Sequence, residues 1–588
     1  MLKKIIVFSL ILLIGFGILA GCGSVSRKQN KVSFTKDGVA HFENGYLYRK
    51  EGVPFLYLKG SSYNMGLQYG VLLKEQINSV YSKLDHLEKS VFANLPVYLR
   101  PLITIFIFVK LIYIKHSLPD EFKNEIRGIS DGSGVSYNKL LLISMLPEIF
   151  NFSCTSFVKI VSGRLIHGRN LDYYFPLIGK NPLVVRYVPS GKIPYTLVGC
   201  VGYTGAYTGM NDYGITLTVD AAPIVDTNKE SALPVTFEIR DILENARNFS
   251  DVEKFLKSYR SIKGWMVIAG SASEKKGAVF NIAGKNVSET PMEDGEIFVT
   301  NTFADKDFAH KFMALSDAES ASSVCRYERF SRLIGNINSV DSAIEALSDI
   351  RFYNYGEVIG AGDVTVNNEG SLQTVVMDPS KHSIYFSSSS VGMYSGFDKF
   401  VKTDALFKDA PVLYREPNYK ILDSSYFKNF SDWFTKAETY YLEGNYKKAL
   451  NTVKGINKPN LIQLEGEENV AEKLGILRKD TSLIEKSDFL IEKYPEYIMP
   501  YLVKAKVLYA SGKYTQTLDT CNQALKTHIK PLYLETEIYS LLVLSYEKTG
   551  KTDLAKENAK RTISIIKNYA IGPKEAKILN KMKEILSK

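Results

Sequence analysis

The chain has 588 residues, which is too long for one compact core and predicts two or three domains. Hydrophobic residues make up 45% of the sequence and charged residues 23%, a composition typical of a folded protein and not of a disordered one. The formal net charge is +10, but the basic residues form no stripe interleaved with aromatic side chains, which argues against nucleic acid as a partner and fits a mild attraction to anionic lipid surfaces.

The N-terminus has the composition of a secretory signal. Two lysines precede an apolar run from Ile5 to Leu19, which ends in small residues and Cys22. The ending LAGC resembles the lipobox of bacterial lipoproteins, and this resemblance implies a signal over residues 1–22, lipidation of Cys22 and a polar tether over residues 23–42. The protein would then be anchored in the cell membrane and lie outside the cytoplasm. The alternative is an uncleaved transmembrane anchor.

An apolar tract follows at residues 90–116, after a segment that predicts two strands and the start of a helix. The tract is interrupted by Pro96, Arg100, Pro101 and Lys110, and its uninterrupted part is short for a bilayer span. Two interpretations stay open. The tract is either a buried helix or an apolar, membrane-facing lid beside a lipid-binding pocket.

The texture of the sequence changes between Cys154 and about Ser390, where short β-branched and aromatic runs alternate with turns. The runs are TSFVKIV, PLVVRYV, GITLTVD, GWMVIAG, GAVFNIAG, EIFVTN, QTVVMD and HSIYFSS. Helical segments such as residues 234–260 lie between them. This pattern predicts a layered domain of the α+β class.

After about Phe430 the chain predicts only helices. Gly444 and Gly512 open similar segments, GNYKKAL and GKYTQTL, and lie 68 positions apart, twice a period of 34 residues. This spacing resembles tetratricopeptide repeats, which are helical hairpins with a glycine in the turn. Residues 425–588 are therefore predicted to form an all-α repeat domain that binds a peptide or a partner protein.

The cysteines form no metal or disulfide pattern. Besides Cys22 they are Cys154, Cys200, Cys325 and Cys521, which are scattered and contain no CxxC pair. Cys200, Cys325 and Cys521 are interpreted as small buried hydrophobic residues.

Cys154 has the most informative surroundings. A strand-like run follows it, and after a turn a second run, RLIHGRNLDYY, carries Arg169 and Asp172. This pattern predicts a hairpin. A thiol beside a guanidinium and a carboxylate can be held as a reactive thiolate, although on this pattern alone an inert buried cysteine is the alternative.

The combination of CTSF with HGRNLD resembles the cysteine N-terminal nucleophile hydrolases. These include acid ceramidase, the N-acylethanolamine amidase, choloylglycine hydrolases and the acyl-coenzyme A:6-aminopenicillanic acid acyltransferase group. Further segments resemble the acyltransferase group in the same order over roughly residues 45–400: GSSYNMGLQYG, RGISDGSGVSYNKLLLIS, TGMNDYG, FVTNTF, VCRYERF and QTVVMD.

The resemblance implies a four-layer αββα fold that cuts its own chain between Ser153 and Cys154. Residues 43–153 would form the first part of this domain, and residues 154–410 the part that carries the nucleophile. The Cys154 thiolate would then attack the substrate, and its own new α-amino group, with a free-peptide pKa of about 7.7–8.0, would be the base.

The resemblance also implies roles for other residues. Asp172 would hold the α-amino group, Arg169 would orient the thiolate, and Asn301 and Asn211 would donate hydrogen bonds to the oxyanion or the substrate. A later arginine, either Arg326 or Arg329, would complete the site. The structural alternatives are a turn cap for the aspartate, turn positions for the asparagines and an ion pair for Arg169.

Together these features predict a lipid-anchored extracytoplasmic amidase or acyltransferase. It would cleave a linear, non-peptide amide with a hydrophobic acyl group through an acyl-Cys154 intermediate, and it would need no metal or organic cofactor. Hydrolysis is favoured over transfer from coenzyme A, which is scarce outside the cell. The alternative is a catalytically silent surface scaffold or assembly factor that acts through the helical repeats.

Overall fold

The residues that the computed structural model describes are 31–93, 116–144, 148, 152–173, 181–226, 232–352, 364–368, 370–388, 395–416, 433, 436–437, 439–441, 443–455 and 460–588. The predictions for the signal, for Cys22 and for most of the apolar tract lie outside these residues. Within the described ranges, no helix is long and apolar enough to cross a membrane.

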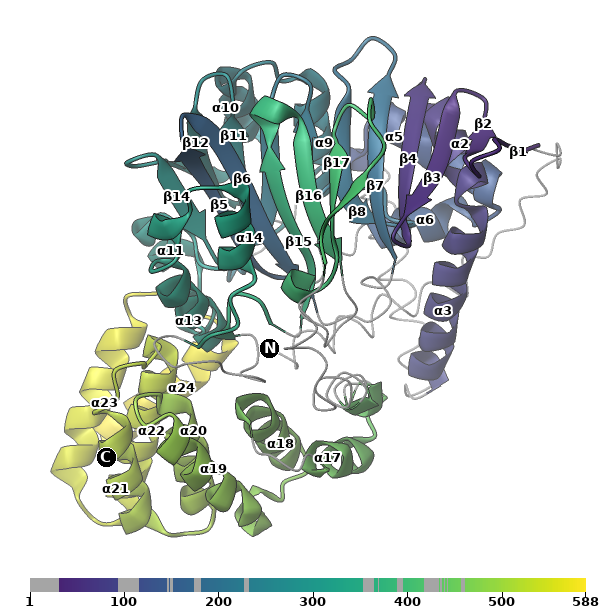
Figure 1. Ribbon diagram of the computed structural model, residues 1–588. Coiled ribbons are helices and arrows are strands. Elements are labelled where there is room, and N and C mark those ends of the chain that lie inside the picture. The colour runs from purple at the N-terminus through teal and green to yellow at the C-terminus, as the bar shows by residue number, and fades with distance from the viewer. Residues whose placement is uncertain are drawn as a thin grey trace.

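Two sheets form the upper part of the molecule in the view of Figure 1. In spatial order the larger sheet consists of β1 (Ser33–Phe34), β2 (Ala40–Phe42), β3 (Gly45–Lys50), β4 (Val53–Gly60), β7 (Pro182–Pro189), β8 (Tyr195–Cys200), β9 (Thr208–Asn211), β10 (Ile215–Ala221), β11 (Gly264–Ser271), β12 (Lys276–Ala283) and β13 (Asn286–Pro291). The smaller sheet consists of β14 (Glu296–Val299), β5 (Ser153–Val161), β6 (Arg164–Asp172), β15 (Ser371–Asp378), β16 (Ser383–Ser388), β17 (Phe400–Asp404) and β18 (Val412–Arg415). We call these strands and the helices between them the sheet domain.

Every strand-like run of the sequence became a strand, because short β-branched runs bounded by turns fit a pleated, buried surface. β11 shows why the sequence lacks a simple alternation of polar and apolar residues. Trp265 and Val267 pack against helices, whereas Met266 and Ile268 pack against the other sheet. Both faces of the strand are covered, so all of its residues are buried.

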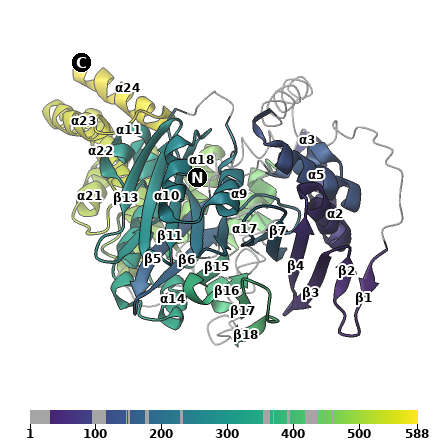
Figure 2. The same cartoon turned by 90° about the horizontal axis from the view of Figure 1, so that it is seen from above.

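The sheet domain has four layers (Figures 1 and 2). The outer face of the larger sheet packs against α2 (Ser62–Leu72), α3 (Lys74–Ala93), α5 (Asp120–Ser133), α6 (Tyr137–Ser144), α9 (Val235–Asn245) and α10 (Phe249–Ser258). The inner faces of the two sheets pack against each other. The outer face of the smaller sheet packs against α13 (Ala321–Phe330) and α14 (Val340–Leu347). The described elements thus have the predicted order of helix, sheet, sheet and helix.

The C-terminal part of the chain is helical. It comprises α17 (Tyr446–Lys454), α18 (Leu461–Lys473), α19 (Ser482–Lys493), α20 (Ile498–Ala510), α21 (Tyr514–Ala524), α22 (Leu532–Lys548), α23 (Thr552–Ile566) and α24 (Pro573–Ser587), which we call the helical domain. Gly444, Gly512 and Gly550 have φ values of 74°, 76° and 74°, the left-handed region that glycine adopts without strain. The turns at Gly444 and Gly512 contain glycine as predicted. Strand β18 extends the sheet domain to Arg415, beyond the expected boundary at residue 410. Strands β1 and β2 belong to the larger sheet, so this domain also begins before the expected boundary at residue 43, and the end of the expected tether over residues 23–42 is part of the sheet.

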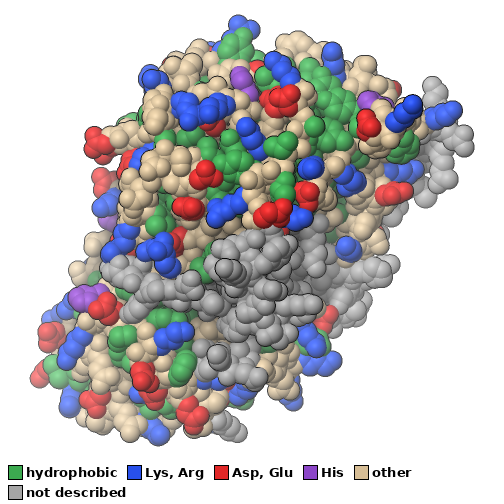
Figure 3. Space-filling model, viewed as in Figure 1, with side chains coloured by type: hydrophobic (Ala, Val, Ile, Leu, Met, Phe, Trp, Pro, Cys, Tyr) green, Lys and Arg blue, Asp and Glu red, His purple; other side chains and the backbone are tan. Residues whose placement is uncertain are grey.

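The surface carries charges of both signs. Figure 3 shows basic and acidic side chains interspersed over the visible described face, without a large area of one sign. The visible part of the described surface therefore has no extended basic area.

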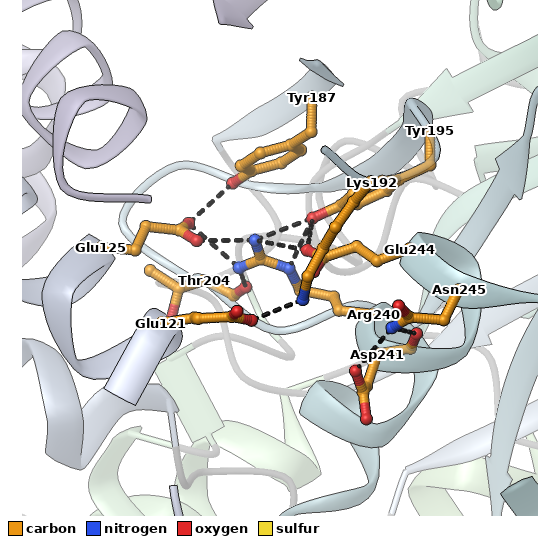
Figure 4. Close-up of polar contacts among 10 residues, drawn as sticks. All are labelled: Glu121, Glu125, Tyr187, Lys192, Tyr195, Thr204, Arg240, Asp241, Glu244 and Asn245. Carbon is orange, nitrogen blue, oxygen red and sulfur yellow. Dashed lines mark hydrogen bonds and ion pairs between the residues drawn. The ribbon is translucent and has the colours of Figure 1, made fainter. Parts of the chain in front are cut away.

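A buried ion pair joins the chain before Cys154 to the chain after it (Figure 4). Arg240 on α9 donates to both carboxylate oxygens of Glu125 on α5, at 3.0 and 2.6 Å. The Tyr195 hydroxyl accepts from the same guanidinium at 3.0 and 2.8 Å, and the Thr204 carbonyl accepts at 2.8 Å. The guanidinium also lies 4.5 Å from the centre of the Tyr187 ring. The charge of Arg240 is therefore fully compensated inside the fold.

Removing one member of this pair should be far more costly than removing both. Glu125→Ala removes the carboxylate that is hydrogen-bonded to the buried Arg240 and leaves only Glu244 at 3.8 Å, which should cost about 3–5 kcal/mol, seen as a lower urea midpoint. Glu125→Leu combined with Arg240→Met should recover much of that loss. Asp241→Ala, on the same helix, should change stability by less than about 1 kcal/mol. Equal losses in Glu125→Ala and Asp241→Ala would contradict this reasoning.

Candidate active site

Cys154 lies at the start of β5, opposite β6. In their antiparallel register Ser156 faces Arg169, so Cys154 and Arg169 are diagonal neighbours on one face of the sheet. A terminal nitrogen of Arg169 donates a hydrogen bond to Cys154 Sγ over 2.9 Å. Both side chains are buried. The structure therefore brings together the thiol and the guanidinium that the sequence placed on one hairpin.

The two faces of β5 have different surroundings, because successive side chains of a strand point to opposite sides. Val158 packs between the two sheets, and Cys154, four positions away, points to the same side. Phe157 packs against the outer helices, and Thr155 on that side accepts a hydrogen bond from Arg326 at 3.1 Å. The thiol thus faces the space between the sheets, and the Cys154 backbone is reached from the helix layer.

Arg169 is held by three further groups. It donates to the Tyr207 carbonyl at 2.9 Å and to the Thr208 hydroxyl at 3.2 Å, both on or beside β9. The Asp220 carboxylate on β10 lies 3.8 Å away and accepts from the Ser156 hydroxyl at 2.8 Å. These contacts fix the guanidinium against the thiol, so its orientation is set before any substrate arrives.

Burial and charge have opposite effects on the thiol. Burial raises the pKa of Cys154, the guanidinium of Arg169 lowers it, and the carboxylates of Asp220 and Asp172 raise it further. The thiol therefore stays protonated at neutral pH in the uncut chain. His167 cannot remove that proton, because burial lowers its pKa to about 3 and its ring nitrogens contact two threonine hydroxyls of β10.

Asp172 ends β6 and lies opposite Ser153 in the strand register. Its carboxylate accepts hydrogen bonds from the Ser371 hydroxyl at 2.5 Å and from the Asn368 amide at 3.1 Å. Burial raises its pKa to about 6, although Arg326 and these two donors favour the ionised form. The carboxylate is thus fixed beside the bond that joins Ser153 to Cys154.

Asn301 follows β14 and holds the chain on both sides of Ser153. Its side-chain oxygen accepts from the Cys154 N–H at 3.0 Å. Its side-chain nitrogen donates to the carbonyls of Phe152 and Ala221, both at 2.8 Å. The predicted residue is therefore in contact with the nucleophile segment, and both amide hydrogens are used in the uncut chain.

Of the two candidate arginines, Arg326 reaches the site. It donates to the Cys154 carbonyl, and it donates to the Asn301 side-chain oxygen at 2.6 Å. Arg329, one helical turn further on α13, instead forms two hydrogen bonds with Asp349 at 3.0 and 2.8 Å. The sequence left open whether Arg326 or Arg329 belongs to the site. Arg326 does, because it lies on the face of α13 that packs against β5.

Asn211 is not brought to this group. It is the last residue of β9, three residues after Thr208, so the backbone positions of Asn211 and Thr208 are about 10 Å apart along the strand. Its nitrogen donates to two carbonyls at the end of α9, at 3.1 and 2.7 Å, and its oxygen accepts from two N–H groups of the next turn, at 3.0 and 3.1 Å. Since all its hydrogen-bonding positions are filled, its contacts do not support the predicted donation to an oxyanion. They fit the structural alternative of a turn residue.

The other described cysteines are buried away from the Arg169 contact. Cys200 accepts from Gln373 at 3.6 Å, Cys325 packs against the helical domain, and Cys521 lies in the core of the helical domain. Burial raises the pKa of Cys200 and of Cys521 to about 12. Their interpretation as small hydrophobic residues fits these surroundings.

Three residues of the site were not predicted from the sequence: Asp220, Ser156 and Thr155. Asp220 is the last residue of the largely apolar run GITLTVD, which forms a fully buried strand. A carboxylate in such a run indicates a buried charge that needs a partner, and this was the available signal. Ser156 and Thr155 gave no signal of their own, because hydroxyl residues are common in strands.

Comparison with known proteins supports a relationship to the N-terminal nucleophile hydrolases. Residues 161–390 match the family described as "Acyl-coenzyme A:6-aminopenicillanic acid acyl-transferase". The central segment is similar to that family. Protein dcd1B of Dictyostelium discoideum is 30% identical over 231 residues, which cover 35% of this chain and 46% of that protein.

Two amidases are also similar. The N-acylethanolamine-hydrolyzing acid amidase of Rattus norvegicus is 31% identical over 175 residues, 28% of this chain and 48% of that protein. The solved structure of a Caenorhabditis elegans ortholog of this amidase is 20% identical, covers 38% of this chain and 93% of that chain, and has a TM-score of 0.30. The chain spans about half the length of the curated relatives it matches.

Arg169 should control the reactivity of the thiol. Arg169→Met removes the charge that lowers the pKa of Cys154, so alkylation by iodoacetamide at pH 7 should slow by about tenfold for each unit by which that pKa rises. Arg169→Lys keeps a charge and should slow it less. Labelling of the Cys154 peptide, followed by mass spectrometry, measures the rates. Arg329→Met is the matched control, and an equal slowing in that variant would show that loss of charge alone explains the effect.

Proposed function

We propose that this chain is a cysteine amidohydrolase or acyltransferase of the N-terminal nucleophile type. The observation that carries the proposal is the arrangement around one peptide bond. Arg169 contacts the Cys154 thiol, while Asn301 and Arg326 hold the backbone of the same residue. Such an arrangement fits a thiol that first cuts its own chain and then attacks an external amide.

The first step of the proposal is cleavage between Ser153 and Cys154. The sulfur of Cys154 attacks the Ser153 carbonyl carbon, the C–N bond breaks, and the nitrogen takes the thiol proton to become a free amine. Water then hydrolyses the resulting thioester, which gives a Ser153 carboxylate and restores the thiol. In the uncut chain Asn301 contacts the groups on both sides of Ser153, which fits a role in fixing the peptide for attack.

The second step uses the same atoms on a substrate. The new α-amino group takes the thiol proton, and the thiolate attacks the substrate carbonyl. The substrate amine leaves with that proton, and water or another amine releases the acyl group from sulfur. Asp172 lies opposite Ser153 in the strand register, where its carboxylate can hold the α-ammonium group.

Asn301 is the proposed donor to the oxyanion. In the uncut chain one of its amide hydrogens is bonded to the Phe152 carbonyl. Withdrawal of the cut end frees this N–H, while the bond to Ala221 keeps the side chain in place. The donor is then oriented before the substrate binds, which is what stabilises a developing charge.

The surroundings of Phe152 support a hydrophobic acyl group. Phe152 is on the acyl side of the Ser153–Cys154 bond, so the acyl group of a substrate would lie where this residue lies now. Its ring is 4.4 Å from the Tyr173 ring and 5.3 Å from the Tyr207 ring, measured between centroids. The Tyr207 ring is stacked on Tyr203 at 5.0 Å. A space bounded by aromatic rings favours an apolar chain over a polar one.

We also propose that the enzyme is attached to the outer side of the cell membrane through a lipid on Cys22, as the LAGC ending implies. Cys22→Ala should move the protein from the membrane fraction to the soluble fraction of cells that process lipoproteins, because one or more acyl chains supply the membrane affinity. Fractionation followed by immunodetection measures this shift. Retention of Cys22→Ala in the membrane would favour an uncleaved anchor instead.

Self-cleavage is the direct test of the proposed function. Intact mass and N-terminal sequencing of the full-length protein should show a fragment that begins with Cys154-Thr155-Ser156. Cys154→Ala should remain uncut because it lacks the nucleophile. Arg326→Met should lower the cleaved fraction, because it removes the contacts to the Cys154 carbonyl and to Asn301.

Arg329→Met is the matched control for this experiment, since it removes the same charge from the same helix without touching Cys154. It should be cut like the natural chain. A natural chain that stays whole under all conditions would remove the proposed base and favour the scaffold alternative. Equal loss of cleavage in Arg326→Met and Arg329→Met would contradict the role given to Arg326.

A further inference from the structure

The helical domain packs against the part of the sheet domain that carries the candidate active site, as Figure 1 shows for α13 and the neighbouring C-terminal helices. Two groups of contacts connect them. One involves α13 and the segment around Phe352, and the other involves α11 (Lys306–Phe312) and α12 (Leu315–Ala318). Each group is a separate apolar cluster that contains residues of both domains.

The first contact uses the face of α13 that is turned away from Cys154. Ala321 and Cys325 lie one helical turn apart and pack into the core of the helical domain with side chains of α18, α19 and α20. The next residue, Arg326, points to Cys154 and Asn301. Ser323 also faces the site and accepts from the Asn301 N–H at 3.1 Å. Helix α13 is therefore held between the site and the helical domain.

Phe352 strengthens this contact from the sheet domain. Its ring meets the rings of Tyr494 and Tyr497 edge to face, with centroids 6.0 and 4.8 Å apart. All three side chains are buried. Phe352 lies three residues after Asp349, the partner of Arg329 on α13, so the same contact also supports the second half of that helix.

The second contact is polar and specific. Helix α12 begins after Ala314, which has no side chain that can cap it. Glu575 on α24 instead accepts a hydrogen bond from the Ser316 N–H at 2.9 Å. Glu575 is only 1% exposed, and nearby the Ala570 N–H donates to the His310 carbonyl at 3.0 Å. The helical domain thus supplies the cap that the sequence of α12 lacks.

Helix α12 is in turn connected to Asn301. The Ala318 carbonyl at its end accepts from the Thr302 hydroxyl at 2.7 Å. The same hydroxyl contacts Ser323 Oγ at 2.8 Å, and Ser323 accepts from Asn301. A continuous set of hydrogen bonds therefore runs from α12 through Thr302 to the residue that holds the Ser153–Cys154 bond.

From these contacts we infer that the helical domain is a positioning element of the active site. It acts through α12 and α13, which orient Asn301 and Arg326, and Glu575 is its principal positioning residue. The inference about catalysis rests on the proposed function, but the coupling between Glu575 and residues 315–330 does not. The helical domain, which was expected to bind a peptide or a partner protein, then binds the sheet domain of its own chain.

Hydrogen exchange in the full-length protein tests the coupling without any assay of activity. Glu575→Ala removes the cap of α12 and should speed exchange of backbone amides in residues 315–330 by roughly tenfold, the effect expected from losing a cap. Exchange in β11 should not change, which would show that the overall fold is kept. Glu575→Gln retains an acceptor oxygen and should restore most of the protection.

Glu584→Ala is the matched control. Glu584 lies on the same helix and pairs with Lys581 and Lys588 on the exposed side. Its loss removes the same carboxylate without touching the sheet domain, so exchange in residues 315–330 should stay as in the natural chain. Unchanged exchange in Glu575→Ala, or equal increases in Glu575→Ala and Glu584→Ala, would overturn the inference.

The rate of self-cleavage tests the consequence for the site. Glu575→Ala should slow cleavage at Ser153–Cys154 by about tenfold, measured below the unfolding temperature of every variant, and Glu575→Gln should restore it. If the natural chain is not cut at all, the proposed function fails, while the exchange result still decides the coupling. If exchange rises in Glu575→Ala but cleavage is unchanged, the helical domain does not position the site.

Discussion

The side chain of Asn301 is the point on which the geometry of the site depends. It makes four hydrogen bonds to groups from three parts of the fold: the Cys154 N–H and the Phe152 carbonyl at the start of β5, the Ala221 carbonyl and the Arg326 guanidinium. These groups belong to the smaller sheet, the larger sheet and the outer helix layer. A buried amide with every hydrogen and lone pair used can adopt one orientation only. It therefore fixes the position of the Ser153–Cys154 bond relative to both sheets.

The thiol of Cys154 and the backbone of Cys154 are contacted from opposite faces of β5. The thiol and Arg169 lie between the sheets, where burial keeps the thiol protonated. Arg326 approaches the same residue from the helix layer and donates to its backbone carbonyl, and Asp172 lies on that face opposite Ser153. Contacts to the thiol and contacts to the backbone can be made to the same residue, because the side chain and the backbone of a strand residue are accessible from different directions. In the proposed reaction the uncut chain is therefore inert toward external amides, since its nitrogen cannot act as a base until the bond is broken.

The strands that form from β-branched and aromatic runs were predictable because local composition decided them, and the hairpin of β5 and β6 already placed Arg169 beside Cys154. β9 was not predictable as a strand, since TGMN reads as a turn and only its neighbours make it one. The strand also places Asn211 three residues beyond Thr208, which the turn-like sequence does not indicate. The choice between Arg326 and Arg329 depends on how α13 docks on β5, which is a tertiary fact. Asp220 became visible as part of the site only when β10 was placed against β5.

A cut between Ser153 and Cys154 would leave the first segment attached to the rest of the fold. Strand β4 comes from the chain before Cys154, yet it pairs in parallel with β7 from the chain after it. The Glu125–Arg240 ion pair joins α5 to α9 across the same divide. Since backbone hydrogen bonds and a compensated buried charge both hold the first segment, cleavage between Ser153 and Cys154 would release only the end that carries Phe152. Asn301 would lose one partner and keep three. The proposed reaction thus changes one contact of the amide on which the site is built and leaves its position unchanged.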